Sequence, residues 1–338
     1  MLSVAAIALA LFVLFRPHGA KAPAPLPVVR ATAAPPIAAV AAPKHTQPWS
    51  PGDRTEVRSQ IENALDGAIS GAGAVSLIAI AHDGTILYSN AADRAVTPAS
   101  VQKLIVADAA LSELGPQYRF DTLFASSQSP GNNAIDGDLW LVTSGDPSLQ
   151  SKDLRAGIAA LRGAGVSSVQ GSLVVDPSAL AGEEINPLWN ADDANEDFMA
   201  ATSGASIDED TVEFRVQGTQ YGEPAGVHLV PSTAPVTYDG TVTTGGGDDV
   251  TVGGTNEPNT FHLSGSIPPG ALERFWVPVH GIPQYLASVT SGLLRKNGIG
   301  VAHAPRTGTV PLDAVVLWNH RSAPLQQLVK HMLFESDN

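Results

Sequence analysis

The spacing of apolar residues predicts that the chain opens with a helix followed by a β-hairpin. From 54 to 72 apolar positions recur at four-residue steps, which is typical of an amphipathic helix. The β-rich runs 75–80 and 85–88 flank an Asp-Gly pair, the usual signature of a tight hairpin turn. A second helical pattern begins near Ser100, and four of its residues are expected to bury one helix face: Leu104, Ala107, Leu111 and Leu114.

The pattern then changes to short strands with few helices. Strands are expected at 118–125, 138–143 and 172–175, and a helix at 154–161. Further strands are expected at 211–216, 226–230, 250–252 and 260–263. Three glycines at 245–247 lack the flanking residues of a phosphate-binding loop, so we interpret them as a β-hairpin tip.

Helical spacing returns toward the end of the chain. A helix is expected at 284–296, a strand at 314–318 and a last helix at 324–334. The strand-rich middle therefore separates two regions in which helices and strands mix. This arrangement predicts an α/β (α+β) fold with a large, mostly β insertion.

Composition argues against several kinds of binding partner and chemical site. Among 338 residues, 33 acidic and 19 basic side chains give a net charge of −14, which argues against nucleic acid. The absence of cysteine excludes disulfides and thiolate metal sites. The nine histidines show no spacing typical of metal ligands, so we expect neither a metal nor another cofactor.

The first 51 residues are expected to lie outside the folded part. The apolar run 2–15 is short for a membrane span and suits a signal-peptide core, so 1–22 is either a cleaved signal peptide or a membrane anchor. Residues 23–51 are rich in Ala and Pro, as in a semi-rigid linker. We therefore expect an exported, periplasmic or otherwise extracytoplasmic protein, which contacts the membrane only through such an anchor.

Ser100 and Lys103 are the first candidate catalytic pair. Positions three apart share one face of a helix, so the Lys103 amine can reach the Ser100 hydroxyl. A serine hydroxyl needs a base to become a nucleophile, and a neutral lysine, favoured by burial, can serve. The same four residues also suit the first turn of an ordinary amphipathic helix, so the pair needs support from elsewhere in the chain.

That support comes from Ser336, Asp337 and Asn338. A Ser-x-x-Lys motif followed by Ser-Asp-Asn belongs to the motif set of β-lactamases and penicillin-binding proteins. Ser336 can relay a proton between Lys103 and the leaving amine, and Asn338 can hydrogen-bond the substrate amide and the lysine. Alone, the three residues are also compatible with a polar helix end.

Over residues 52–338 the chain resembles the D-alanyl-D-alanine carboxypeptidase/endopeptidase family, the class C low-molecular-mass penicillin-binding proteins. The resemblance is carried by the segments 97–104, 141–149, 171–176, 263–268, 322–325 and 332–338. The separation of 236 residues between Ser100 and Ser336 (336 − 100) fits this family, because class A β-lactamases place the motifs much closer together.

The resemblance implies a serine β-lactamase/transpeptidase-like catalytic domain with an antiparallel sheet, formed by 52–125 and 281–338 and interrupted by an insertion at 126–280. It also implies an acyl-enzyme at Ser100, formed on peptidoglycan stem peptides and trapped by β-lactams as covalent inhibitors. Within the insertion, Asp192 or Asp193 resembles an acidic residue that recognises the stem-peptide amine; a solvated acidic loop is the alternative.

One family motif is missing. A Lys-Thr-Gly strand should follow Ser-Asp-Asn, but the sequence ends at Asn338, and Arg306-Thr-Gly308 comes too early and in a Pro-flanked loop. We therefore expect a C-terminally truncated family member that is poorly folded or inactive as written, whereas its complete version would be an active hydrolase. The alternatives are an inactive peptidoglycan-binding relative, or a β-lactamase or esterase with the same Ser-Lys pair.

Overall fold

The computed structural model describes residues 49–69, 76–81, 83–187, 189 and 196–337, which fall into two compact units divided between Val96 and Thr97. The predicted signal or anchor segment and nearly all of the linker lie outside the described residues. Among those described, no helix is long and apolar enough to cross a membrane.

The first unit consists of one helix and one hairpin. Helix α2 (Pro51–Ile69) packs against strand β2 (Ile86–Asn90), which pairs in antiparallel fashion with β1 (Leu77–Ile80). The Asp83-Gly84 turn joins the two strands, and Gly84 has a φ of 87°, a conformation that glycine adopts without strain. The expected helix and hairpin are confirmed.

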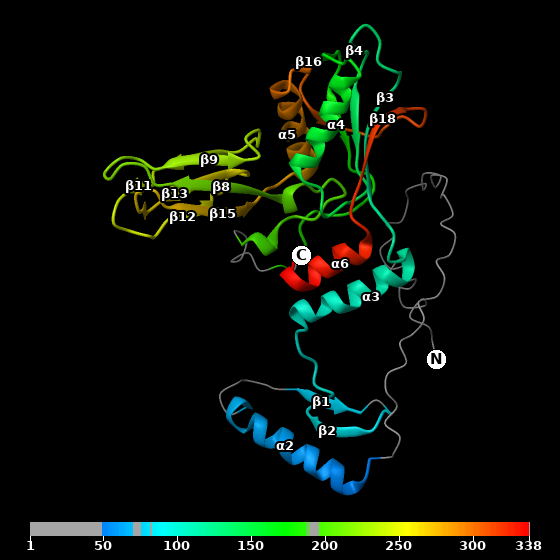
Figure 1. The fold of residues 1–338 in the computed structure, drawn as a ribbon, viewed down its shortest axis with the longest axis vertical. Helices are drawn as coiled ribbons and strands as arrows, with labels where there is room; N and C mark the ends of the chain where they lie inside the picture. The colour runs from blue at the N-terminus through cyan, green and yellow to red at the C-terminus, as the bar shows by residue number, and fades with distance from the viewer. Residues whose placement is uncertain (1–48, 70–75, 82, 188, 190–195, 338) are drawn as a thin grey trace. The chain divides into compact units, whose positions relative to one another are not determined.

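The second unit is built on a five-stranded mixed sheet (Figure 1). Its strands are, in spatial order, β17 (Arg306–Thr307), β7 (Leu173–Asp176), β5 (Leu139–Val142), β3 (Asp121–Ser126) and β18 (Val315–Arg321). Pairing is parallel from β17 to β5 and antiparallel from β5 to β18. Strands β5 and β7 of this sheet come from the predicted insertion, whereas β17, β18 and nearly all of β3 come from the predicted catalytic domain. The domain boundaries themselves remain a prediction.

Two helices cover this sheet. Helix α4 (Ser151–Gly163) packs on β18, and α5 (Ile282–Lys296) packs on β7 and β17 (Figure 1). Their apolar faces bury Leu154, Ile158 and Leu286 against the sheet, beside the fully buried Phe124. A small three-stranded sheet lies nearby and contains β4 (Ala134–Ile135), β6 (Ser168–Val169) and β16 (Gly300–Val301).

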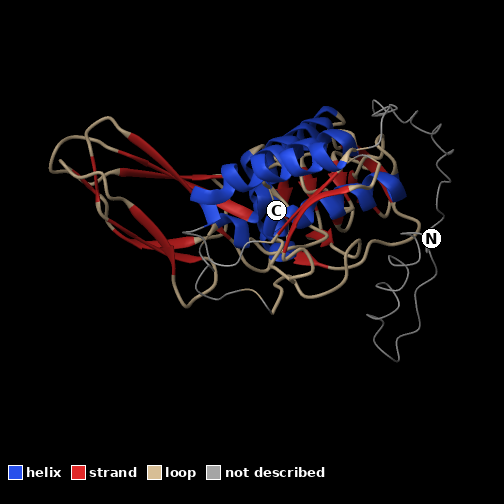
Figure 2. Cartoon of the chain, turned by 90° about the horizontal axis from the view of Figure 1, so that it is seen from below, coloured by secondary structure: helices blue, strands red, loops and turns tan. Residues whose placement is uncertain are grey.

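The strand-rich middle forms an arm made of strands and loops (Figures 1 and 2). Its strands are β8 (Thr211–Gln217), β9 (Gly226–Val230), β10 (Thr237–Gly240), β11 (Thr243–Thr244), β12 (Thr251–Gly254), β13 (Thr260–Ser264), β14 (Ser266–Ile267) and β15 (Leu272–Pro278). Strand β8 is central to one sheet, between β15 and β9. The mostly β character expected for this region is confirmed.

The three glycines at 245–247 are not a hairpin tip. They follow β11, which pairs in parallel with β14, so the chain does not turn back on itself there. A Cβ atom at Gly247 would lie 2.8 Å from the Cβ of Ser266. Glycine is needed at this position because the loop runs directly against Ser266.

Helices α3 (Gln102–Leu114) and α6 (Leu325–Glu335) pack against each other (Figure 1). The expectation that four residues of α3 bury one face is wrong for two of them, since Leu104 is 57% exposed and Leu114 is 47% exposed. Ala107 is buried and Leu111 is half-buried. Within the described part of this unit, the side of α3 that carries Leu104 and Ile105 is left uncovered.

Candidate active site

Ser100 lies in a sharp turn that leads into α3. It is the middle residue of a short 3-10 helix, η1 (Ala99–Val101), and the amide of Val101 donates to the carbonyl of Pro98 at 3.1 Å. Ala99 has a φ of 44°, in the left-handed region that costs a non-glycine residue about 1–2 kcal/mol. The turn places the Ser100 hydroxyl at the start of the helix, one turn before Lys103.

Helix α6 is anchored at its first turn to the segment between α3 and β3. The amides of Leu325 and Gln326 donate to the carbonyls of Tyr118 and Pro116 at 2.8 and 3.1 Å. The buried Ser322 adds two hydrogen bonds to this anchoring. Its amide donates to the carbonyl of Phe120 and its hydroxyl accepts from the amide of Phe120, both at 2.9 Å. The start of α6 is therefore tied to the end of α3.

This anchoring makes the two helices antiparallel and brings their far ends together. The 11 residues of α6 rise by about 16 Å, which carries the chain from the end of α3 back to its beginning. Ser336 then ends the helix with a φ of 60°, in the left-handed conformation. The Ser336 side chain consequently meets the first turn of α3, although 236 residues separate it from Ser100 in sequence.

Ser100 and Lys103 both contact Ser336. The Lys103 Nζ donates to the Ser336 Oγ at 3.2 Å and also to the Ser336 carbonyl. The Ser336 Oγ lies 3.3 Å from the Ser100 Oγ, within hydrogen-bonding distance. The Ser336 hydroxyl thus lies between the candidate nucleophile and the candidate base, where it can pass a proton from one to the other.

The pair is less buried than the sequence led us to expect. Lys103 is half-buried, and Ser100 and Ser336 are exposed. The cause is the uncovered side of α3, where Ile105 is 71% exposed.

The structure does not describe three of the other residues predicted for the site, and it gives the segment at Arg306 a different role. Asn338, Asp192 and Asp193 lie outside the described residues, so their roles remain predictions. Arg306 and Thr307 form strand β17 rather than the expected loop. The Arg306 guanidinium pairs with Asp138 at 2.6 Å and lies over the Trp140 ring, 5.7 Å from its centre, which gives Arg306 a structural role in the sheet.

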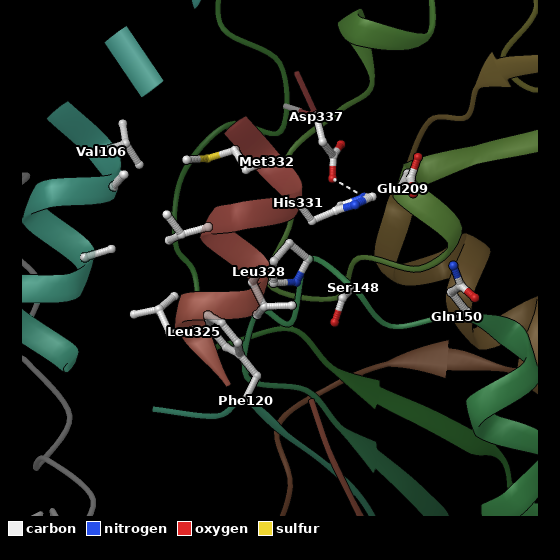
Figure 3. Close-up of a pocket in the computed structure, with 14 residues that line it drawn as sticks. Val106, Phe120, Ser148, Gln150, Glu209, Leu325, Leu328, His331, Met332 and Asp337 are labelled. Atoms are coloured by element: carbon white, nitrogen blue, oxygen red, sulfur yellow. Dashed lines mark ion pairs between the residues drawn. The ribbon is translucent and has the colours of Figure 1, made fainter. Parts of the chain in front are cut away.

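A cavity of about 260 Å³ lies between α3 and α6, and its lining includes Asp337, the residue that follows Ser336. Its walls are mostly apolar and include Val106, Leu325, Leu328 and Met332 (Figure 3). At one end it is polar, and there His331 faces Asp337 (Figure 3). The sequence reasoning missed His331, because a single histidine on a helix carries no motif.

The chain belongs to the D-Ala-D-Ala carboxypeptidase 3 (S13) family, whose model matches residues 57–338. It is 31% identical over 302 residues to a D-alanyl-D-alanine carboxypeptidase of Actinomadura sp. (strain R39), covering 84% of this chain and 55% of that protein. It is 27% identical over 254 residues to D-alanyl-D-alanine carboxypeptidase DacB of Haemophilus influenzae (strain ATCC 51907 / DSM 11121 / KW20 / Rd), covering 71% of this chain and 51% of the relative.

Solved structures agree with this assignment. The crystal structure of penicillin binding protein 4 (dacB) from Haemophilus influenzae superposes with a TM-score of 0.63 at 25% identity, covering 76% of this chain and 58% of that one. The same protein complexed with a novel β-lactam gives a TM-score of 0.55 at 25% identity, with 76% and 56% covered. The family resemblance and the fold class are confirmed, and the chain spans about half the length of the curated relatives it matches.

Proposed function

We propose that this protein is a serine-type D-Ala-D-Ala carboxypeptidase or endopeptidase that acts on peptidoglycan stem peptides through an acyl-enzyme at Ser100. The observation that carries the proposal is the meeting of Ser100 and Lys103 at the Ser336 hydroxyl, with contacts of 3.3 and 3.2 Å. Membership of the S13 family supports it, and so do relatives named D-alanyl-D-alanine carboxypeptidase.

In the proposed acylation, each proton transfer uses a group on this chain. Lys103, as the neutral amine, takes the Ser100 proton directly or through the Ser336 hydroxyl, and the Ser100 Oγ attacks the peptide carbonyl. The proton then returns through Ser336 to the leaving amine, and the C–N bond breaks. Water hydrolyses the ester at Ser100 in a second step and regenerates the serine.

The proposal includes three further points that come from the sequence. Asn338 contacts the substrate amide and Lys103, and Asp192 or Asp193 contacts the stem-peptide amine. The protein works outside the cytoplasm, because the 1–22 segment either directs its export or anchors it to the membrane. β-Lactams acylate Ser100, which the solved complex of the Haemophilus relative with a β-lactam supports.

The test is the rate of labelling by a fluorescent penicillin, compared among matched variants. We expect Lys103→Met to slow labelling at least a hundredfold and Ser336→Ala at least tenfold, because general-base catalysis contributes about 10²–10⁴-fold. Lys152→Met is the control, since Lys152 is an exposed lysine on α4.

The lifetime of the label and the release of D-alanine decide among the outcomes. A long-lived label, together with D-alanine release from a D-Ala-D-Ala peptide, supports the proposal. Rapid loss of the label would instead identify a β-lactamase. Equal labelling of the wild type, Lys103→Met and Lys152→Met would refute the role of Lys103.

A further inference from the structure

Three metal-ligating side chains converge at the polar end of the cavity. They are Glu209, His331 and Asp337, and their ligand atoms all lie within 4.8 Å of one another. The His331 Nε2 and Asp337 Oδ2 atoms are 3.7 Å apart. Figure 3 shows the three side chains directed toward a common point: His331 and Asp337 come from α6 and the turn that follows it, and Glu209 comes from a segment far away in sequence.

We propose that Glu209, His331 and Asp337 bind a divalent cation, with Zn²⁺ as the best match. One imidazole and two carboxylates are a nitrogen and oxygen donor set that Zn²⁺ accepts, and water can complete a four-coordinate site. The two carboxylates balance the charge of the ion, so the complex is neutral when His331 is neutral. Imidazole is a weak match for Ca²⁺ or Mg²⁺, which prefer oxygen ligands alone.

The distances require only a small adjustment. Ligands that are about 2.0–2.2 Å from a tetrahedral Zn²⁺ lie about 3.3–3.6 Å from each other. The His331–Asp337 pair is therefore already at nearly the correct separation. The ligand atoms all lie within 4.8 Å of one another, so the remaining gap is at most about 1.5 Å. Glu209 and His331 are exposed, so a change of side-chain rotamer can close it without moving the backbone.

The backbone holds Glu209 on the side facing His331. Glu209 is the middle residue of the short helix η4 (Asp208–Asp210), and all three residues have positive φ, with 57° at Glu209. Its neighbours are held by hydrogen bonds, since Asp208 accepts from the amide of Ser151 at 2.9 Å and Asp210 from the amide of Ile207 at 3.0 Å. The backbone position of Glu209 is thus fixed by the hydrogen bonds of its two neighbours.

A cation here would act on the candidate active site, because Asp337 directly follows Ser336. Binding would link the turn that carries Ser336 to both α6 and η4, which restrains Ser336 beside Lys103. This consequence rests on the proposed function, whereas cation binding itself does not. Cation binding and its effect on the candidate active site are therefore measured separately.

The experiment is a titration of the full chain, freed of metal by chelation, with Zn²⁺ in competition with a chromophoric chelator. We expect one Zn²⁺ per chain, at least tenfold weaker binding in His331→Ala and in Glu209→Gln, and unchanged binding in His303→Ala. His303 is the control because it is an exposed histidine that does not belong to the cluster of Glu209, His331 and Asp337. Circular dichroism checks that each variant is folded.

A second readout uses Co²⁺ in place of Zn²⁺. Intense visible bands that appear with the wild type and are lost in His331→Ala support a low-coordinate site that contains the imidazole. Absence of binding at 100 μM Zn²⁺, or equal affinity in His331→Ala and His303→Ala, overturns the proposal. The rate of penicillin labelling with and without Zn²⁺ then tests the effect on Ser336; a chain that binds Zn²⁺ but is never labelled refutes the proposed function and not the cation site.

Discussion

Asp210 is expected to make the protein less stable as the pH rises. Its side chain is 4% exposed, and burial raises its pKa from 3.8 to about 7. Hydrogen bonds from Ser206 and Ile207 oppose this increase, and the negative charges of Glu184 and Asp208 add to it. Burial dominates because removing a carboxylate from water is costly unless the charge is fully compensated.

The size and sign of the effect follow from the two pKa values. In the unfolded chain Asp210 ionises near pH 3.8, whereas in the folded chain it keeps its proton until about pH 7. Its contribution to stability is therefore fully present below pH 3.8, is lost progressively between about pH 4 and 7, and stays lost above pH 7. A difference of about three pKa units corresponds to about 4 kcal/mol, as an upper limit.

Asp210→Asn removes this ionisation and leaves an amide oxygen that can still accept from Ile207. Between pH 4 and pH 8, the unfolding free energy should fall less in this variant than in the wild type. The difference between the two decreases is expected to be at most about 4 kcal/mol. Urea unfolding at four pH values measures the difference. Asp313→Asn, at an exposed position, is the control and should follow the wild type. Parallel curves for Asp210→Asn and the wild type would refute the reasoning.

Three further changes, one of them with a matched control, test the packing around the sheet and helices. Gly157→Ala should destabilise the fold by about 1–3 kcal/mol in urea unfolding, because the new Cβ would lie 2.6 Å from the ring of Trp318. Gly163→Ala in the same helix has open space, so it should cost nothing. Ser322→Ala should cost about 1–2 kcal/mol and slow penicillin labelling, because α6 loses an anchor at its first turn. Arg306→Ala should change stability by less than about 1 kcal/mol and leave labelling unchanged, since its ion pair is half-exposed and belongs to the sheet.

The local elements were largely predictable because they depend on neighbouring residues. The helix at 282–296 and the hairpin at 77–90 both follow from short-range spacing and turn residues. Strand β17 was missed because it is only two residues long and forms through pairing with β7, which lies far away in sequence. The exposure of Leu104 was also unpredictable, since helical spacing shows which face is apolar and not whether another element covers it.

In the candidate site, too, the local motifs were predictable from the sequence and the long-range contacts were not. The spacing of Ser100 and Lys103 could be interpreted from the sequence alone, and so could the motif that begins at Ser336. Their proximity depends on Ser322, whose hydrogen bonds to Phe120 orient α6, and no local pattern indicates that contact. Glu209 and His331 come together only through the fold.

The most direct test of the central claim is the intact mass of the chain after incubation with benzylpenicillin. The contacts of Ser100 and Lys103 with Ser336 argue against the inactivity expected from the sequence. The account therefore predicts an increase equal to the mass of one penicillin, located by peptide mapping on the peptide that contains Ser100 and absent in Ser100→Ala. Ser112→Ala, at an exposed serine on α3, is the matched control and should still form the adduct. An adduct that persists in Ser100→Ala, or that maps to another residue, would contradict the account.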